Sequence, residues 1–84
     1  MTSQATKDAG TILAANIRLA REAKGWTQRE LAARVNGLDA LAVSRWERAV
    51  AVPRQDNLQA LAEATSRTLA WFYTDHSEQE VQVA

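Results

Sequence analysis

Two helix start signals that lie close together in the middle of the chain constrain its fold more than any other feature. Thr27-Gln28-Arg29-Glu30 forms a capping box, in which the Thr27 side chain caps the Glu30 amide and the Glu30 side chain reaches back to Thr27. Asp39 is a second helix N-cap, and Asn36-Gly37 tolerates positive φ and stops the preceding helix. The pattern predicts helices over residues 28–35 and 40–48, separated by only about three or four residues, which is typical of a helix-turn-helix.

Apolar periodicity and capping residues predict three further helices. Leu13, Ile17 and Ala20 share one face of a helix over residues 9–24, which Gly25 ends in a left-handed conformation. Helices over residues 55–64 and 69–74 follow, the first after Pro53 and the second capped by Thr68. We expect an all-α fold, a compact bundle of five short helices with a helix-turn-helix. Its expected domain spans residues 9–74, after a disordered N-terminal lead over residues 1–8 and before an acidic flexible tail over residues 75–84.

The composition fits one small helical domain with a thin core. The chain has 84 residues, and alanine, the strongest helix former, accounts for 17 of them against 16 for isoleucine, leucine and valine together. A chain of this size buries only about 60% of its unfolded surface, so it gains stability from a partner subunit. It has no cysteine, which excludes disulfides and Cys-type zinc sites. No apolar run approaches about 18 residues and no signal peptide begins the chain, so we expect a cytoplasmic protein.

The net charge of zero conceals two oppositely charged parts. Residues 18–54 hold eight basic and four acidic residues, whereas residues 55–84 hold one basic and five acidic residues. This asymmetry is consistent with a surface that faces a polyanion, and equally with a dipolar surface that has no partner. His76 lies beside Asp75, Glu78 and Glu80 in the expected tail, where no pocket is expected. We interpret that group as a solvated cluster, and expect no enzyme, cofactor or metal site.

One ordered set of residues narrows the fold to a family. The set is Ile17-Arg18-x-x-Arg21, Gly25-Trp26-Thr27-Gln28-x-Glu30-Leu31-Ala32, Val43-Ser44-Arg45-Trp46-Glu47-Arg48, and then Pro53, Leu58 and Leu61-Ala62. It resembles the lambda-repressor-like Cro/cI (XRE) family of helix-turn-helix DNA-binding domains over about Leu13–Phe72. The resemblance implies a sequence-specific regulator of transcription, most simply a repressor, that binds a two-fold double-stranded DNA operator as a homodimer in a bacterial or phage-infected cell.

The resemblance also assigns roles to single residues. Val43 and Trp46 are three residues apart and can both face the core, so the opposite side of their helix would enter the major groove. By position, Ala40, Leu41, Ser44 and Arg45 match base-facing sites, and Arg45 can hold guanine O6 and N7 with two hydrogen bonds. A solvated surface charge is the alternative for Arg45. Phosphate contacts fall to Thr27, Gln28, Arg48 and Arg54.

Arg21 and Glu47 match an internal ion pair of the family, which makes them structural. A phosphate contact is the alternative for Arg21. Three positions depart from the family pattern. The turn at Asn36-Gly37-Leu38 is one residue longer, Ala49 stands where a glycine often ends the recognition helix, and the base-facing positions hold no Gln or Asn.

The helix over residues 69–74 is the candidate dimer surface. Phe72 is expected to fill the core, which leaves Leu69, Trp71 and Tyr73 partly exposed. Trp71 could instead cap the edge of the core, and Val81 and Val83 could add a strand across a dimer. A different function is also open, a protein-interaction module with weak or no DNA binding that uses Ala40, Leu41 and Trp71. The residues do not distinguish a phage repressor, a restriction–modification controller and an antitoxin, and they indicate no membrane or small-molecule ligand.

Overall fold

Five helices account for the regular structure in the computed structural model, which describes residues 8–77. They are α1 (Ala9–Ala23), α2 (Gln28–Ala33), α3 (Ala40–Glu47), α4 (Gln55–Thr65) and α5 (Leu69–Phe72). The described residues contain no strand, so the all-α fold with five short helices is confirmed. No helix in this part of the chain is long and apolar enough to cross a membrane. Residues 1–7 of the expected lead (1–8), residues 78–84 of the expected tail (75–84) and the strand expected at Val81 and Val83 lie outside the described residues.

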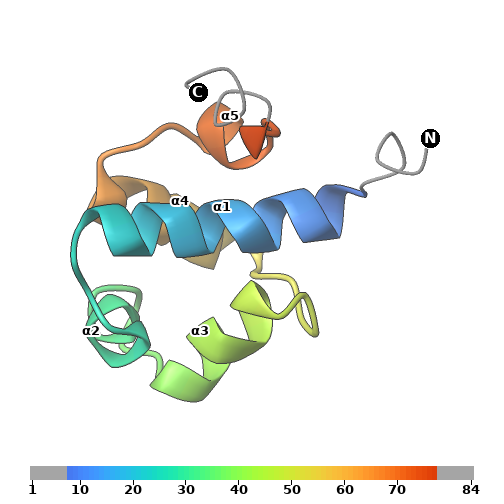
Figure 1. Ribbon diagram of the computed structural model, residues 1–84. Coiled ribbons are helices and arrows are strands. Elements are labelled where there is room, and N and C mark those ends of the chain that lie inside the picture. Colours follow the sequence, from blue (N-terminus) through green and yellow to red (C-terminus); the bar gives the residue numbers. More distant parts are fainter. Residues whose placement is uncertain (1–7, 78–84) are drawn as a thin grey trace.

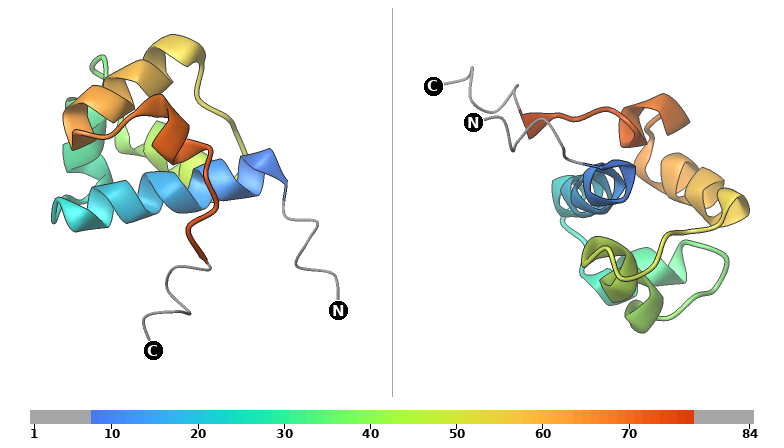
Figure 2. Two further views of the ribbon diagram at one scale, coloured as in Figure 1. Left: turned by 90° about the horizontal axis from the view of Figure 1, so that it is seen from above. Right: turned by 90° about the vertical axis from the view of Figure 1, so that its right-hand side faces the viewer.

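Helix α1 runs through the centre of the arrangement (Figure 1). Helices α2 and α3 lie below it in that view, α5 lies above it, and α4 passes behind it. The view along α1 shows the same order, with α1 between the helix-turn-helix and α5 (Figure 2). The helix-turn-helix and the candidate dimer helix therefore occupy opposite sides of α1.

Side-chain caps start four of the five helices, and the sequence predicts those at Thr27, Asp39 and Thr68. Asp8, Thr27, Asp39 and Thr68 each accept a hydrogen bond from the amide three residues later, over 2.8–3.1 Å. The capping box at α2 is complete, because the Thr27 amide also donates to Glu30 Oε1 over 2.8 Å. Helix α4 is the exception, since its N-cap Arg54 makes no capping side-chain bond.

The C-terminal ends of the helices differ from the predicted ends more than the N-terminal starts do. Helix α2 ends at Ala33 rather than Val35, so six residues separate α2 from α3, and the predicted spacing of three or four was wrong. The reason is packing: the chain leaves helical geometry after α2 so that Val35 becomes fully buried and Leu38 packs against the core. Asn36 and Gly37 take φ of 50° and 69° in this turn, the left-handed conformation expected of them.

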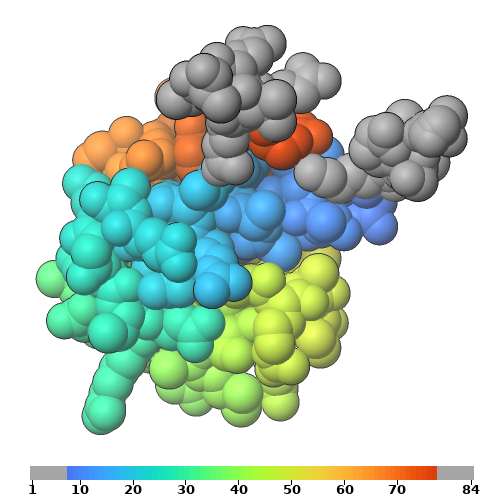
Figure 3. Space-filling model, in the orientation of Figure 1, coloured from blue at the N-terminus to red at the C-terminus, as the bar shows by residue number. Residues whose placement is uncertain are grey.

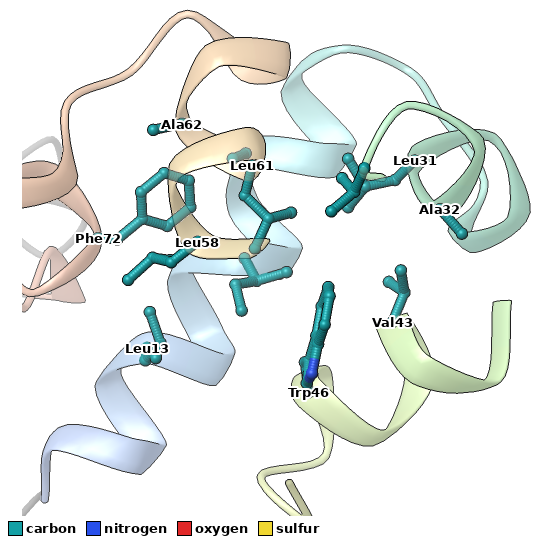
Figure 4. Packing of buried hydrophobic residues seen from close by; sticks show 12 residues of the cluster. Leu13, Leu31, Ala32, Val43, Trp46, Leu58, Leu61, Ala62 and Phe72 are labelled. Atoms are coloured by element: carbon teal, nitrogen blue, oxygen red, sulfur yellow. The ribbon is translucent and has the colours of Figure 1, made fainter. Parts of the chain in front are cut away.

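The core lies where the five helices meet. In Figure 4, Val43 and Trp46 extend from α3 and Leu58 and Leu61 from α4 toward one cluster, which Phe72 of α5 completes. Phe72 is fully buried, as expected. Side chains from all five helices thus converge on one cluster, to which α1 contributes Ile17 and α2 contributes Leu31.

Asn16 is a buried polar residue whose role the sequence did not reveal. Its Nδ2 donates to the carbonyl oxygens of Phe72 and Thr74 over 2.8 and 2.7 Å, and lies 3.3 Å from that of Trp71. These are the carbonyl groups that a helix leaves without partners at its C-terminal end. Asn16 therefore ends α5 at Phe72, whereas the sequence predicted a helix to Thr74.

His76, which we assigned to a loose tail without a pocket, packs against the folded domain. Its ring stacks on Trp71 with 4.4 Å between the centroids, and Nε2 lies 2.9 Å from the Trp71 carbonyl oxygen. It also lines a cleft beside α1. The interpretation of His76 as solvated was wrong, because Trp71, which lies on α5 before the expected tail, holds the His76 ring against the domain.

Ala49 ends α3 with φ of 61°, the strained conformation that glycine relieves. We expect Ala49→Gly to raise the free energy of unfolding by about 1 kcal/mol, measured by urea denaturation. Ala15→Gly is the matched control, because Ala15 is exposed in the middle of α1 and the same change there costs about 1 kcal/mol. Destabilisation by both changes would show that Ala49 stores no strain.

Candidate nucleic-acid interface

Helix α3 turns one side inward and leaves the other outside. Val43 is fully buried and Trp46 is 5% exposed, and both side chains point into the core (Figure 4). On the opposite side Leu41 is 50% exposed and Arg45 is also exposed. Ala40 and Ser44 are half-buried. The helix lies at the lower edge of the molecule, where no other described segment covers it (Figure 1).

The outward side chains of α3 differ in whether they already form hydrogen bonds within the chain. Arg45 makes no side-chain hydrogen bond or ion pair with any residue between 8 and 77. Ser44 is engaged, because its Oγ accepts from Arg48 Nε over 3.2 Å. Arg45 therefore presents a full set of donors in a fixed fork, whereas Ser44 already contacts a neighbour on its own helix.

Glu47 holds the ends of three helical segments together. Its Oε2 accepts from Arg21 Nε of α1 over 2.7 Å, and its Oε1 accepts from Arg21 Nη2 and from Gln28 Nε2 of α2 over 3.1 Å each. Arg21 Nη1 donates to the Trp26 carbonyl oxygen over 2.8 Å. The Glu47 and Arg21 side chains are 4% and 13% exposed. The hydrogen bonds to Glu47 raise the pKa of Arg21 above its ordinary value.

The four candidate phosphate contacts lie at helix ends. Thr27 and Gln28 begin α2, Arg48 ends α3 and Arg54 precedes α4. Gln28 contacts Glu47, so the start of α2 lies against the last residue of α3. The Arg54 side chain is 84% exposed and only 3.7 Å from Asp56, a pair too open to hold it firmly.

The three candidate dimer residues at α5 differ in how exposed their side chains are. Arg67 lies 4.7 Å from the centre of the Trp71 ring and His76 stacks on the same ring at 4.4 Å. Much of the Trp71 indole is therefore already in contact with other side chains of the chain. Leu69 is half-buried and packs on the core. Tyr73, 53% exposed, is the most available of the three.

Sequence reasoning missed an exposed apolar pair in the loop between α3 and α4. Val50 and Val52 are 65% and 64% exposed, on either side of half-buried Ala51. The alternation of exposed and buried residues up to buried Pro53 is a strand-like signal that a search for helices overlooks.

Comparisons with known proteins agree with this geometry. A family model described as "Helix-turn-helix" matches residues 17–72. The structure resembles that of a hypothetical transcription factor, NHTF, from Neisseria, with a TM-score of 0.76 and 31% identity over 92% of this chain and 86% of that one. It also resembles the P22 c2 repressor protein in complex with synthetic operator 9T, with a TM-score of 0.70 and 28% identity over 75% of this chain and 94% of that one. No curated protein gives a significant match.

The shared carboxylate of Glu47 predicts a large stability effect. We expect Glu47→Ala to lower the free energy of unfolding by about 3 kcal/mol, because it leaves the Arg21 guanidinium largely buried without its partner. Glu22→Ala is the control. It removes an exposed pair with Arg18 and a longer contact of 4.0 Å with Arg21, and should cost less than about 0.5 kcal/mol because the Glu22 side chain is 53% exposed. Urea denaturation of both variants measures the difference, and equal small losses would contradict the role of the network.

Proposed function

The chain belongs to the XRE-type helix-turn-helix family of DNA-binding transcription regulators, and from this premise we propose that it is a sequence-specific repressor that binds a two-fold operator as a homodimer. The observation that carries the proposal is the outward side of α3, where Arg45 is exposed and has no partner among the described residues. Its place of action is then the cytoplasm of a bacterial or phage-infected cell, where the duplex DNA lies.

The four candidate base-reading residues of α3 make different kinds of contact with the bases. Arg45 reads a guanine through O6 and N7, a contact that distinguishes bases by about 1–3 kcal/mol. Leu41 contributes apolar contact with a thymine methyl group, because its side chain is half exposed and has no polar atom. Ala40 and Ser44 are half-buried and lie beside these two, where they limit which bases fit.

Backbone contacts come from the ends of helices near α3. The Gln28 amide at the start of α2 donates to a phosphate beside the Thr27 hydroxyl, and Arg48 and Arg54 add charge on either side of the loop after α3. Glu47 supports this arrangement by binding Gln28 and Arg21 together. The same carboxylate that stabilises the fold thus positions one phosphate contact relative to the recognition helix.

A dimer supplies the specificity that one short helix lacks. One recognition helix reads about 4–5 base pairs, and two copies about one helical turn apart read a two-fold operator. The structure of the P22 c2 repressor in complex with a synthetic operator supports this mode of action for a related fold. Tyr73 is the exposed side chain of α5 that we propose for the dimer contact, with Leu69 and Trp71 supporting it from the core side.

A protein-interaction module remains the second candidate. Exposed Leu41, Val50 and Val52 favour it, because apolar side chains on a small domain suit a protein partner. A gel shift against random duplexes at low salt separates the two functions, since non-specific DNA binding is strongest there. Absence of any shift would favour the interaction module.

Selection of bound duplexes from a random pool tests the assignment of Arg45. We expect Arg45→Ala to abolish the preference at one base pair in each half-site while the fold is retained, because the exposed side chain makes no hydrogen bond or ion pair with another described residue. Arg48→Ala and Arg54→Ala should weaken binding to all sequences about equally. An unchanged selected motif for Arg45→Ala would mean that another residue reads the bases.

The salt dependence of binding measures the number of phosphate contacts. With about 3–4 contacts in each subunit, a dimer neutralises about 6–8 phosphates, and the slope of log K against log salt should be about −5 to −7. Fluorescence anisotropy with a labelled duplex over a salt series gives the slope. A slope near zero would be incompatible with this electrostatic interface.

A further inference from the structure

A cleft of about 570 Å³ lies along the outer side of α1, away from the outward side of α3. Its floor includes half-buried Ile12 and Leu19 and exposed Ala15, which form a second apolar stripe on α1. The last residue of the described part, Ser77, also lines it. Figure 3 shows this side of the molecule, with α1 crossing above α3. The core uses the other apolar stripe of α1, so the cleft stripe has no role in the fold described above.

The cleft also contains a cation that the domain leaves without a carboxylate. Arg18 lines the cleft but pairs with Glu22 over 3.2 Å, and Glu47 is occupied by Arg21 and Gln28. Arg48, which lines the same cleft, contacts only Ser44 among the described residues. The site therefore combines an apolar floor with the open cation of Arg48 at its α3 side, and it also includes the Asp75 carboxylate, which accepts from Ser77 N and Oγ over 2.9 and 2.7 Å.

We propose that the segment Glu78–Ala84 of the same chain binds in this cleft, with its glutamates toward Arg48 and its valines on the α1 stripe. The segment follows Ser77 directly, so it begins at the cleft. It carries Glu78 and Glu80 and no basic residue, and Val81 and Val83 alternate with a polar residue. The valines thus complement the α1 stripe, and the glutamates complement Arg48.

The length of the segment also suits the cleft. Seven extended residues span up to about 23 Å, at about 3.3 Å for each residue. The part of α1 that lines the cleft, from Thr11 to Glu22, is about 16 Å long at 1.5 Å for each residue. The segment can therefore run along the whole cleft without strain in its connection to Ser77.

The consequence is an internal competitor for DNA, which rests on the function proposed above. Arg48 is both the open cation of the cleft and a proposed phosphate contact, so Glu78 or Glu80 and a phosphate would compete for it. Bound in the cleft, the acidic segment would lower the affinity of the domain for all duplexes, and DNA would release it.

Disulfide trapping tests the binding of the segment without DNA. The chain has no cysteine, so the double variant Ala15→Cys/Val81→Cys holds the only two thiols. We expect rapid formation of an intramolecular disulfide, detected by mass spectrometry of the monomer. The control Ala70→Cys/Val81→Cys places one thiol on exposed α5, outside the cleft and nearer in sequence. A freely moving segment would close this shorter loop at least as fast.

Equal rates for the two pairs, or no disulfide, would overturn the proposal. Disulfides that form only between two chains would overturn it as well, because they would assign the cleft to a second copy.

The competition is measured by duplex affinity at fixed salt. We expect Glu80→Gln to strengthen binding about twofold to fivefold, the range for a surface ion pair. Glu63→Gln removes the same charge from exposed α4, outside the cleft, and should change affinity less. Equal effects of the two variants would contradict the competition. If the chain bound no DNA at all, the proposed function would fail, and the trapping experiment would still decide whether the segment binds in the cleft.

Discussion

The burial of Val43 and Trp46 is the constraint on which the remaining structure depends. Helix α3 has only eight residues, so two anchors on one side determine which few side chains can lie on the other. Leu41 and Arg45 are exposed for this reason, so the choice of the residues that we propose as base readers follows from core packing. A small helical domain thereby obtains an outward surface on α3 without a separate element to support it.

Burial alone leaves α3 free to tilt, and the hydrogen bonds of Glu47 oppose this freedom. One carboxylate accepts from Arg21 and Gln28, which belong to two different helices, at the end of α3 opposite Asp39. Burying the Glu47 carboxylate, whose side chain is 4% exposed, costs free energy. Hydrogen bonds from the charged Arg21 and from the Gln28 amide offset this cost. The network contributes orientation as well as stability, since it fixes the start of α2 beside α3.

The sequence predicted features that arise from local hydrogen bonds and missed those that arise from distant contacts. The caps at Thr27 and Asp39 involve residues three apart, so their pattern is visible in the chain. Asn16 bonds to carbonyl groups 56 and 58 residues away, and no local pattern indicates that. The early end of α2 likewise follows from tertiary packing of Val35, which outweighs helix propensity. The inward side of α3 was predictable because burial follows the helical period.

The central claim is that the Leu41–Arg45 side of α3 enters the major groove. Its most direct test is an NMR titration of the labelled protein with a selected operator duplex, followed through the backbone amide signals. The account predicts the largest shifts at Leu41, Ser44 and Arg45 and at the start of α2, with Gln59 and Glu63 of α4 nearly unchanged. Shifts centred on α4 or α5, with residues 41–45 unaffected, would contradict it.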